Sequence, residues 1–180
     1  MKKRYAALIF CAIGLLLGSV TSEAKKKPSV TAESAIVMDV QSGAILYEKN
    51  IDKREYPASI TKVMTALVAI DNSSLSETVT YSRNAVTNLE SGASNIEIQP
   101  GEKLSMEDSL YAILLMSANE ACNGVAEHVA GSIDNFVAMM NQKAKELGCT
   151  GTHFANANGL WMSNPVSYTH LRAHETLSDL

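Results

Sequence analysis

The chain has 180 residues, of which 46% are hydrophobic and 19% charged, and its formal net charge is −4. This length allows one domain with a sizeable core. No basic stripe recurs beyond the N-terminus, so the composition argues against nucleic acid as a partner.

The N-terminus has the layout of a signal peptide. A cationic head precedes an apolar run over about residues 5–20, and the small residues Ser22 and Ala24 follow this run. We expect residues 1–24 to be a signal peptide cleaved after Ala24, and residues 25–33 to be a polar linker. The alternative is a membrane anchor, but the run is shorter than the roughly 20 residues that a spanning helix needs. The sequence therefore predicts an exported chain.

A hairpin and a helix are expected next. Two short strands, residues 35–40 and 44–48, flank a turn at 41–43. A lone hairpin is marginal in water and needs partner strands, and none are evident downstream. The stretch "EYPASITKVMTALVAI", residues 55–70, then predicts an apolar helix, because Pro57 stands where a fixed φ and a missing N–H suit a helix start.

The following part of the chain is expected to be loop-rich at first and then helical. Residues 76–101 are mixed, with Gly, Ser, Asn and Pro as loop signals. Ser105 followed by Asp108 resembles a capping box and opens a helix through "LYAILLM". A second helix ends at Gly131, and Ser132 caps a third. A hairpin followed mostly by helices gives an α/β (α+β) chain.

The C-terminal residues, 166–180, differ from everything before them. His170 and His174 stand at i, i+4 with Glu175 beside them, which would suit a zinc-binding helix. The order is wrong for H-E-x-x-H, and no third ligand is obvious. The peptide "VSYTHLRAHET" instead matches the translation of a transposon-type sequencing-library adapter. We interpret residues 166–180 as an adapter-derived tail and leave them out of the fold prediction.

Two cysteines remain once the signal peptide is removed, Cys122 and Cys149. An exported chain could join them in a disulfide. However, Cys122 lies in an apolar helix and Cys149 follows the helix-ending Gly148, so two buried thiols are an equal alternative.

Ser59 and Lys62 stand three positions apart at the start of the predicted apolar helix, on one face of it. Free N–H groups and the macrodipole of a first turn favour negative charge, and therefore an attacking oxygen and its oxyanion. Desolvation and the helix N-terminus both disfavour the ammonium form of Lys62, which leaves a neutral amine able to take the Ser59 proton. The alternative is a capping serine beside a snorkelling lysine.

Other matches to these short patterns occur in the chain. A second S-x-x-K begins at Ser22 and lacks comparable surroundings, and one S-x-N, at Ser82, lies in a polar stretch. The S-x-N formed by Ser117 and Asn119 lies where one apolar helix ends and another begins, a break that exposes polar groups at a cavity wall. Ser117 could relay a proton to a leaving group, and Asn119 could hold Lys62 or a substrate carbonyl. The alternative is that both residues cap the next helix.

Three stretches resemble D-alanyl-D-alanine carboxypeptidases, the low-molecular-weight penicillin-binding proteins of a serine peptidase family. They are residues 34–70, then "EKLSMEDSLYAILLMSANEACNGVAEHVAGS" and "FVAMMNQKAKELGCTGTHFANANGL". This family carries S-x-x-K, a second S-x-N element and K-T-G. The resemblance implies that Ser59 is the acylated nucleophile and Lys62 its proton acceptor, with Ser117 and Asn119 as the second element.

The resemblance also implies a fold and a reaction. Residues 34–165 would be the N-terminal part of the catalytic domain, with a partial β-lactamase/transpeptidase-like fold. The family removes the terminal D-alanine from peptidoglycan stem pentapeptides through an acyl-enzyme that water resolves, β-lactams acylate the same serine, and no metal or other cofactor is required. The implied location is the cell wall or the outer face of the cytoplasmic membrane.

No K-T-G occurs in the chain. We therefore interpret it as an N-terminal fragment, without the third motif, the later sheet strands and any membrane-associating C-terminal region, and we expect it to be inactive by itself. Two alternatives remain. One is a β-lactamase-type serine hydrolase of the same fold, and the other is a non-catalytic exported protein that binds the cell wall.

Overall fold

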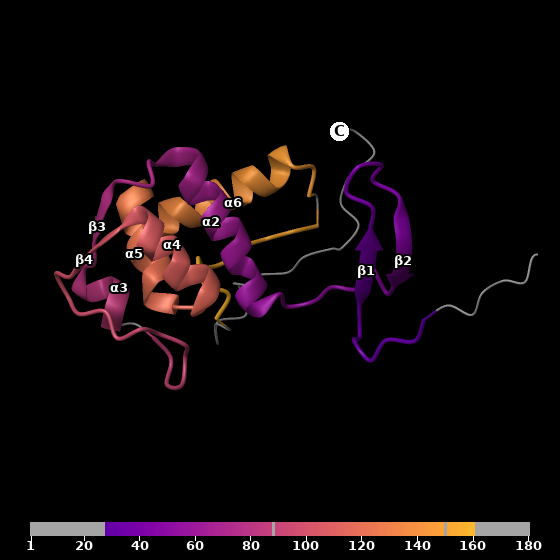
Figure 1. Ribbon diagram of the computed structural model, residues 1–180, viewed down its shortest axis with the longest axis horizontal. Coiled ribbons are helices and arrows are strands. Elements are labelled where there is room, and N and C mark those ends of the chain that lie inside the picture. Colours follow the sequence, from indigo (N-terminus) through magenta and orange to yellow (C-terminus); the bar gives the residue numbers. More distant parts are fainter. Residues whose placement is uncertain (1–27, 88, 150, 161–180) are drawn as a thin grey trace, which may run out of the picture. The chain divides into compact units, whose positions relative to one another are not determined.

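The computed structural model describes residues 28–87, 89–149 and 151–160. The expected signal peptide and the expected tail lie outside these residues. The chain divides into two compact units, Met1–Thr31 and Ala32–Leu180, and all the elements named below belong to the second. In chain order they are β1 (Ala35–Met38), β2 (Ile45–Lys49), the 3₁₀ turn η1 (Ala58–Ile60), α2 (Thr61–Asn72), β3 (Thr78–Thr80), α3 (Arg83–Thr87), β4 (Lys103–Ser105), α4 (Met106–Leu115), α5 (Asn119–Ala130) and α6 (Ile133–Glu146) (Figure 1).

The predicted N-terminal hairpin is confirmed. β1 and β2 pair antiparallel, with Ala35 opposite Lys49 and an irregularity in register after Val37. The Asp39 carboxylate accepts the backbone N–H of Ser42 at 2.8 Å and its hydroxyl at 2.5 Å, which closes the turn. β1 ends two residues earlier than expected and β2 is shifted by one. Within the described residues the two strands pack against each other and against no other element.

A second small sheet was missed. β3 pairs antiparallel with β4, with Val79 opposite Leu104, inside and next to a stretch that the sequence predicted to be mostly loop. Backbone bonds between Tyr81 and both Gly101 and Glu102 extend the pairing. Each strand has three residues. A three-residue strand is too short to show the alternation by which strands are recognised, so the long-range pairing decides the structure here.

The predicted helix caps are confirmed. Ser105 Oγ accepts the backbone N–H of Asp108 at 3.0 Å and donates to its carboxylate at 2.6 Å, which opens α4. Ser132 Oγ accepts the N–H of Asn135 at 3.2 Å at the start of α6. α5 ends at Gly131, whose φ of +75° is the left-handed conformation typical of a helix C-terminus.

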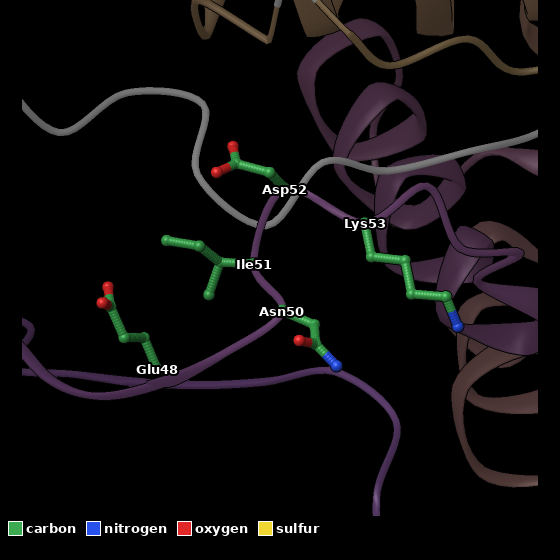
Figure 2. A pocket seen from close by; sticks show the side chains of 5 residues that line it. All are labelled: Glu48, Asn50, Ile51, Asp52 and Lys53. Atoms are coloured by element: carbon green, nitrogen blue, oxygen red, sulfur yellow. The ribbon is translucent and has the colours of Figure 1, made fainter.

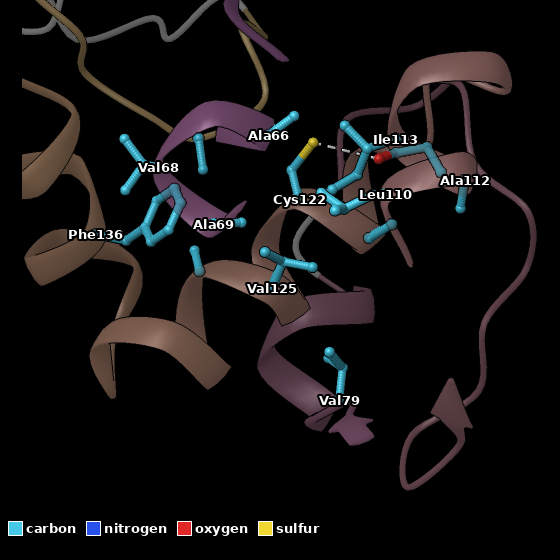
Figure 3. Close-up of a cluster of buried hydrophobic side chains, with 14 of the residues drawn as sticks. Ala66, Val68, Ala69, Val79, Leu110, Ala112, Ile113, Cys122, Val125 and Phe136 are labelled. Carbon is cyan, nitrogen blue, oxygen red and sulfur yellow. Dashed lines mark hydrogen bonds between the residues drawn. The ribbon is translucent and has the colours of Figure 1, made fainter. Parts of the chain in front are cut away.

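The core lies among α2, α4, α5 and α6, with β3 packed against α5 (Figures 1 and 3). Cys122 lies inside this core, and its Sγ donates to the Ala118 carbonyl at 3.4 Å. Burial raises the pKa of the Cys122 thiol to about 12. No disulfide joins Cys122 to Cys149, so both are thiols, but only Cys122 is buried as the two-thiol alternative expected, and Cys149 is half-buried.

Gly124 allows β3 and α5 to approach each other closely. A Cβ at this position would lie 2.3 Å from two ring carbons of Tyr81, far inside van der Waals contact. The Tyr81 side chain is fully buried, and its hydroxyl donates to Ser109 Oγ at 2.7 Å. Burial raises the pKa of Tyr81 to about 12. The glycine thus makes room for the largest side chain in this part of the core.

α2 is buried on one face and exposed on the other. Ile60, the last residue of η1, forms an exposed apolar stripe with Val63, Leu67 and Ile70 of α2, and Val63 is 62% exposed. Larger exposed apolar patches normally mark a surface that contacts another protein, a membrane or a ligand. No helix among the described residues is both long enough and apolar enough to cross a membrane. The opposite, buried face of α2 carries Lys62.

Candidate active site

Ser59 lies on η1, the 3₁₀ turn that leads into α2, rather than inside the α-helix itself. Ala58, just before it, has a φ of +47°, a conformation that costs an alanine about 1–2 kcal/mol. Gly159, with a φ of +81°, packs against this turn so closely that a Cβ there would lie 1.9 Å from the Ala58 carbonyl oxygen. Strained backbone of this kind concentrates at functional sites, and here it presents an exposed serine.

Lys62 lies one turn further on and is 2% exposed. Its Nζ donates to Asn119 Oδ1 at 2.8 Å and to the Asn158 carbonyl at 2.7 Å. The same nitrogen lies 3.3 Å from Ser59 Oγ. Burial lowers the pKa of Lys62 below its ordinary 10.5, the direction expected from the sequence. A poorly solvated amine is therefore held against the serine.

Ser117 and Asn119 lie at the break between α4 and α5, and there they contact Ser59 and Lys62. Ser117 Oγ lies 2.9 Å from Ser59 Oγ, and Ser117 itself has a φ of +56°. The first residue of α5 is Asn119, and the residue before it, Ala118, is the N-cap and makes no side-chain capping bond. The alternative in which Ser117 and Asn119 cap the helix is therefore wrong, and the structure brings together all four of the residues singled out in the sequence.

The competing S-x-N at Ser82 has a different role. Ser82 Oγ accepts the backbone N–H of Ala85 at 3.0 Å, which fits a cap of α3. Asn84 donates to the Glu127 carboxylate at 2.8 Å. Neither side chain contacts Ser59. The competing S-x-x-K at Ser22 lies outside the described residues.

The loop of residues 154–160 supplies a contact that the sequence did not predict. Its Asn158 reaches Lys62 through a backbone carbonyl, an atom that every residue has and that no motif can reveal. Asn156 Oδ1 holds this backbone by accepting the N–H groups of Asn158 at 3.2 Å and Gly159 at 2.6 Å. The density of asparagine and glycine in "NANGL" was the available signal, since these residues organise tight loops.

The site brings together two hydroxyls, an amine and a side-chain amide. Among the residues that the structure describes, no group of three or more His, Cys, Asp or Glu side chains is placed to hold a metal ion. What the four residues can do is nucleophilic chemistry, because a serine hydroxyl has both an amine and a second hydroxyl within reach.

A separate open pocket of about 560 Å³ lies at the end of β2 (Figure 2). It has no nucleophile paired with a base, and its lysine forms ion pairs with Glu33 and Glu55. It is lined by Glu48, Asn50, Ile51, Asp52 and Lys53. We therefore place the candidate site at Ser59 and not here.

Comparison with known proteins identifies the family of the chain. A family model described as D-alanyl-D-alanine carboxypeptidase matches residues 21–173. The D-alanyl-D-alanine carboxypeptidase DacF of Bacillus subtilis is 36% identical over 169 residues, which are 88% of this chain and 43% of that protein. The carboxypeptidase DacC of Escherichia coli is 38% identical over 141 residues, which are 74% of this chain and 35% of that protein.

Solved structures give the same result for the fold. Penicillin binding protein 6B of Escherichia coli superposes with a TM-score of 0.76 at 31% identity, covering 84% of this chain and 49% of that one. A D-alanyl-D-alanine carboxypeptidase of Mycobacterium tuberculosis gives a TM-score of 0.75 at 33% identity, covering 84% and 55%. Compared with the curated relatives DacF and DacC, the chain spans about two fifths of their length. It belongs to the D-alanyl-D-alanine carboxypeptidase family, and its mixed α/β architecture is that of the penicillin-binding proteins.

Proposed function

We propose that the full-length protein is a serine-type D-Ala-D-Ala carboxypeptidase that trims the terminal D-alanine from peptidoglycan stem pentapeptides. One observation carries this proposal: the buried amine of Lys62 lies 3.3 Å from Ser59 Oγ, and a second hydroxyl, that of Ser117, lies 2.9 Å from the same oxygen. Family membership supports the same reaction.

The contacts of Lys62 fit a neutral amine. Such an amine has two N–H groups and one lone pair. Its two short bonds, to Asn119 Oδ1 and the Asn158 carbonyl, use both N–H groups. The lone pair is then left for the Ser59 hydroxyl, which is the third neighbour of the nitrogen. Burial favours this uncharged form.

The reaction follows from these positions. Ser59 Oγ attacks the carbonyl carbon of the penultimate D-alanine while its proton passes to Lys62 Nζ. The bond from that carbon to the nitrogen of the terminal D-alanine breaks, and the leaving nitrogen takes a proton through Ser117. Water then attacks the ester, releases the shortened peptide and restores the serine hydroxyl. A β-lactam would acylate Ser59 by the same first step.

We place the K-T-G element in a further part of the full-length protein. The chain contains no K-T-G and spans about two fifths of its curated relatives. The exposed apolar stripe from Ile60 to Ile70 is compatible with this, because an exposed apolar surface of this kind marks a contact, and a further part of the protein could make that contact. We also propose that residues 166–180 are adapter-derived, and resequencing of the locus should show a different sequence after Pro165 with a K-T-G beyond it.

We further propose that the protein acts outside the cytoplasmic membrane, on the cell wall, after removal of residues 1–24. The cationic head and short apolar run support export. N-terminal sequencing of the exported protein should begin at Lys25. Recovery of an uncleaved N-terminus would contradict this part of the proposal.

The central experiment is labelling of the full-length protein with a fluorescent penicillin, followed by mass spectrometry of the labelled peptide. We expect one adduct, on Ser59, and release of D-alanine from a peptide that ends in D-Ala-D-Ala. Ser59→Ala should abolish both, whereas Ser82→Ala, in the competing S-x-N, should retain both. A folded wild-type protein without an adduct would indicate a non-catalytic binding protein instead, and rapid turnover of the penicillin without peptide cleavage would indicate a β-lactamase.

A further inference from the structure

We infer that Glu120 is a positioning residue for the acylation machinery: it fixes the loop segment 94–96, and this segment fixes the orientation of the Asn119 side-chain amide toward Lys62. The inference rests on the proposed function, because its consequence is measured as serine acylation. Glu120 lies directly after Asn119 in the first turn of α5 and is 1% exposed.

Two consecutive residues of α5 hold the segment. Glu120 Oε1 accepts the backbone N–H of Ile96 at 2.6 Å. The Ser94 carbonyl accepts the backbone N–H of Asn119 at 3.0 Å and its side-chain Nδ2 at 2.8 Å. Ser94 and Ile96 are otherwise exposed to solvent, so few other contacts hold this part of the loop.

The Ser94 carbonyl decides which way the Asn119 amide points. The two ends of an asparagine amide have nearly the same shape, and hydrogen bonds alone distinguish its oxygen from its nitrogen. With Nδ2 bound to the Ser94 carbonyl, Oδ1 faces Lys62 Nζ at 2.8 Å. In the opposite orientation an N–H donor would face the amine, and Lys62 would lose one of its two short bonds.

The carboxylate of Glu120 holds this segment through one oxygen and leaves its other oxygen without a hydrogen bond. Its second oxygen, Oε2, is buried and has no hydrogen-bond partner. Glu120 also lines an open pocket of about 340 Å³, to which the end of α3 and the loop after it contribute the other residues, Val86, Thr87, Leu89, Asn95, Glu97, Ile98, Gln99 and Pro100. Burying a carboxylate oxygen without a partner costs free energy. A residue that served only to stabilise the helix would not need a buried carboxylate at this cost.

The competing explanation is that Glu120 only stabilises α5. An acidic residue in a first turn interacts favourably with the helix macrodipole, by about 0.3–1 kcal/mol. In that case Glu120→Ala would lower thermal stability but leave the pH profile of acylation unchanged. The two explanations therefore differ in a measurement that is independent of stability.

The experiment measures the rate of acylation of the full-length protein by a fluorescent penicillin between pH 5 and 10. For Glu120→Ala we expect the rate plateau to fall about ten- to a hundredfold, because misplaced catalytic groups cost rates of that order. We also expect the midpoint of the profile to move to lower pH, because the Lys62 ammonium loses an acceptor and its pKa falls further. Glu120→Gln, which retains the Oε1 acceptor, should stay within about twofold of wild type.

Two further variants make the test sharper. Ile96→Pro removes the donor from the other end of the same bond, at an exposed position, and should reproduce Glu120→Ala even if that variant folds poorly. Glu102→Ala is the matched control, since Glu102 accepts the backbone N–H of Gln99 at 2.9 Å in the same loop without touching Asn119. It should leave the rate and the midpoint unchanged.

Coupling to Asn119 decides the mechanism. In an Asn119→Ala background, Glu120→Ala should change the remaining rate less than twofold, because residues that act through one another are not additive. Independent, multiplying effects would overturn the inference, and so would an unchanged pH midpoint in Glu120→Ala. If the wild-type protein itself forms no adduct on Ser59, then the proposed function fails, a result distinct from failure of the inference.

Discussion

Replacement of Lys62 by Met tests the central feature of the site, the buried amine. The substitution keeps a long flexible side chain in the same space and removes the nitrogen. Two acceptors, Asn119 Oδ1 and the Asn158 carbonyl, then lose their bonds of 2.8 and 2.7 Å. Each buried acceptor left without a partner costs about 1–3 kcal/mol. Lys62 is an ammonium in the unfolded chain, so folding must either bury that charge or remove its proton, at a cost of up to several kcal/mol that the substitution recovers.

These opposing contributions are similar in size, so we expect the free energy of unfolding to change by less than about 2 kcal/mol. Acylation should respond very differently. General-base catalysis contributes about 10²–10⁴-fold in rate, and among the described residues Lys62 is the amine whose nitrogen is hydrogen-bonded to Ser59 Oγ. Lys62→Met should therefore reduce acylation by a fluorescent penicillin at least a hundredfold while the thermal unfolding transition stays cooperative.

Lys143→Met is the matched control for this measurement. Lys143 lies on α6 and pairs with Asp71 at 2.8 Å on the protein surface, so its loss should leave acylation unchanged and cost at most about 1 kcal/mol of stability. If Lys62→Met remained folded and was acylated at the rate of wild type, the amine would not be the proton acceptor, and the reasoning from its burial would be refuted.

Three further outcomes are expected. The acylation rate should rise with pH as Lys62 loses its proton and should level off below pH 10.5, because burial lowers the pKa of Lys62. Between the lowered pKa of the folded protein and the 10.5 of the unfolded chain, the unfolded chain binds more protons at this position. Lys62 therefore makes the free energy of unfolding rise with pH in that range. A flat profile would contradict this. Gly124→Ala should cost about 1–3 kcal/mol in thermal denaturation, because its Cβ would overlap the Tyr81 ring. Ser105→Ala should cost about 1 kcal/mol, because α4 loses the cap that binds the Asp108 N–H, and an unchanged melting temperature would exclude that role.

Local signals in the sequence were sufficient for much of the fold. The hairpin, the caps at Ser105 and Ser132 and the end of α5 at Gly131 were all predicted, because each depends on contacts within a few residues. β3, β4 and α3 were missed, since each has three to five residues. Such short segments are stabilised by residues that are distant in the sequence. A local sequence pattern therefore cannot predict them.

The sequence by itself indicated which residue types the proposed chemistry uses. A serine and a lysine three positions apart share a helix face in any helix, and the resemblance of residues 34–160 to the carboxypeptidases named the second element. Whether Ser117 or Ser82 would meet Ser59 was argued from the apolar context alone. The distances between the side chains settle which residues belong together, and one of them is the 2.9 Å between the Oγ atoms of Ser59 and Ser117. These distances arise only when α2 and the α4–α5 break pack together.

Tertiary structure alone decided how the amine is held. One of its two short bonds ends on the backbone carbonyl of Asn158, and the other depends on an amide oriented by the carbonyl of Ser94. Backbone carbonyls are chemically identical at every position, so a sequence cannot say which of them will face a lysine. Packing of the 94–96 segment and the 154–160 loop around α5 makes that choice, and the burial that lowers the pKa of Lys62 results from the same packing.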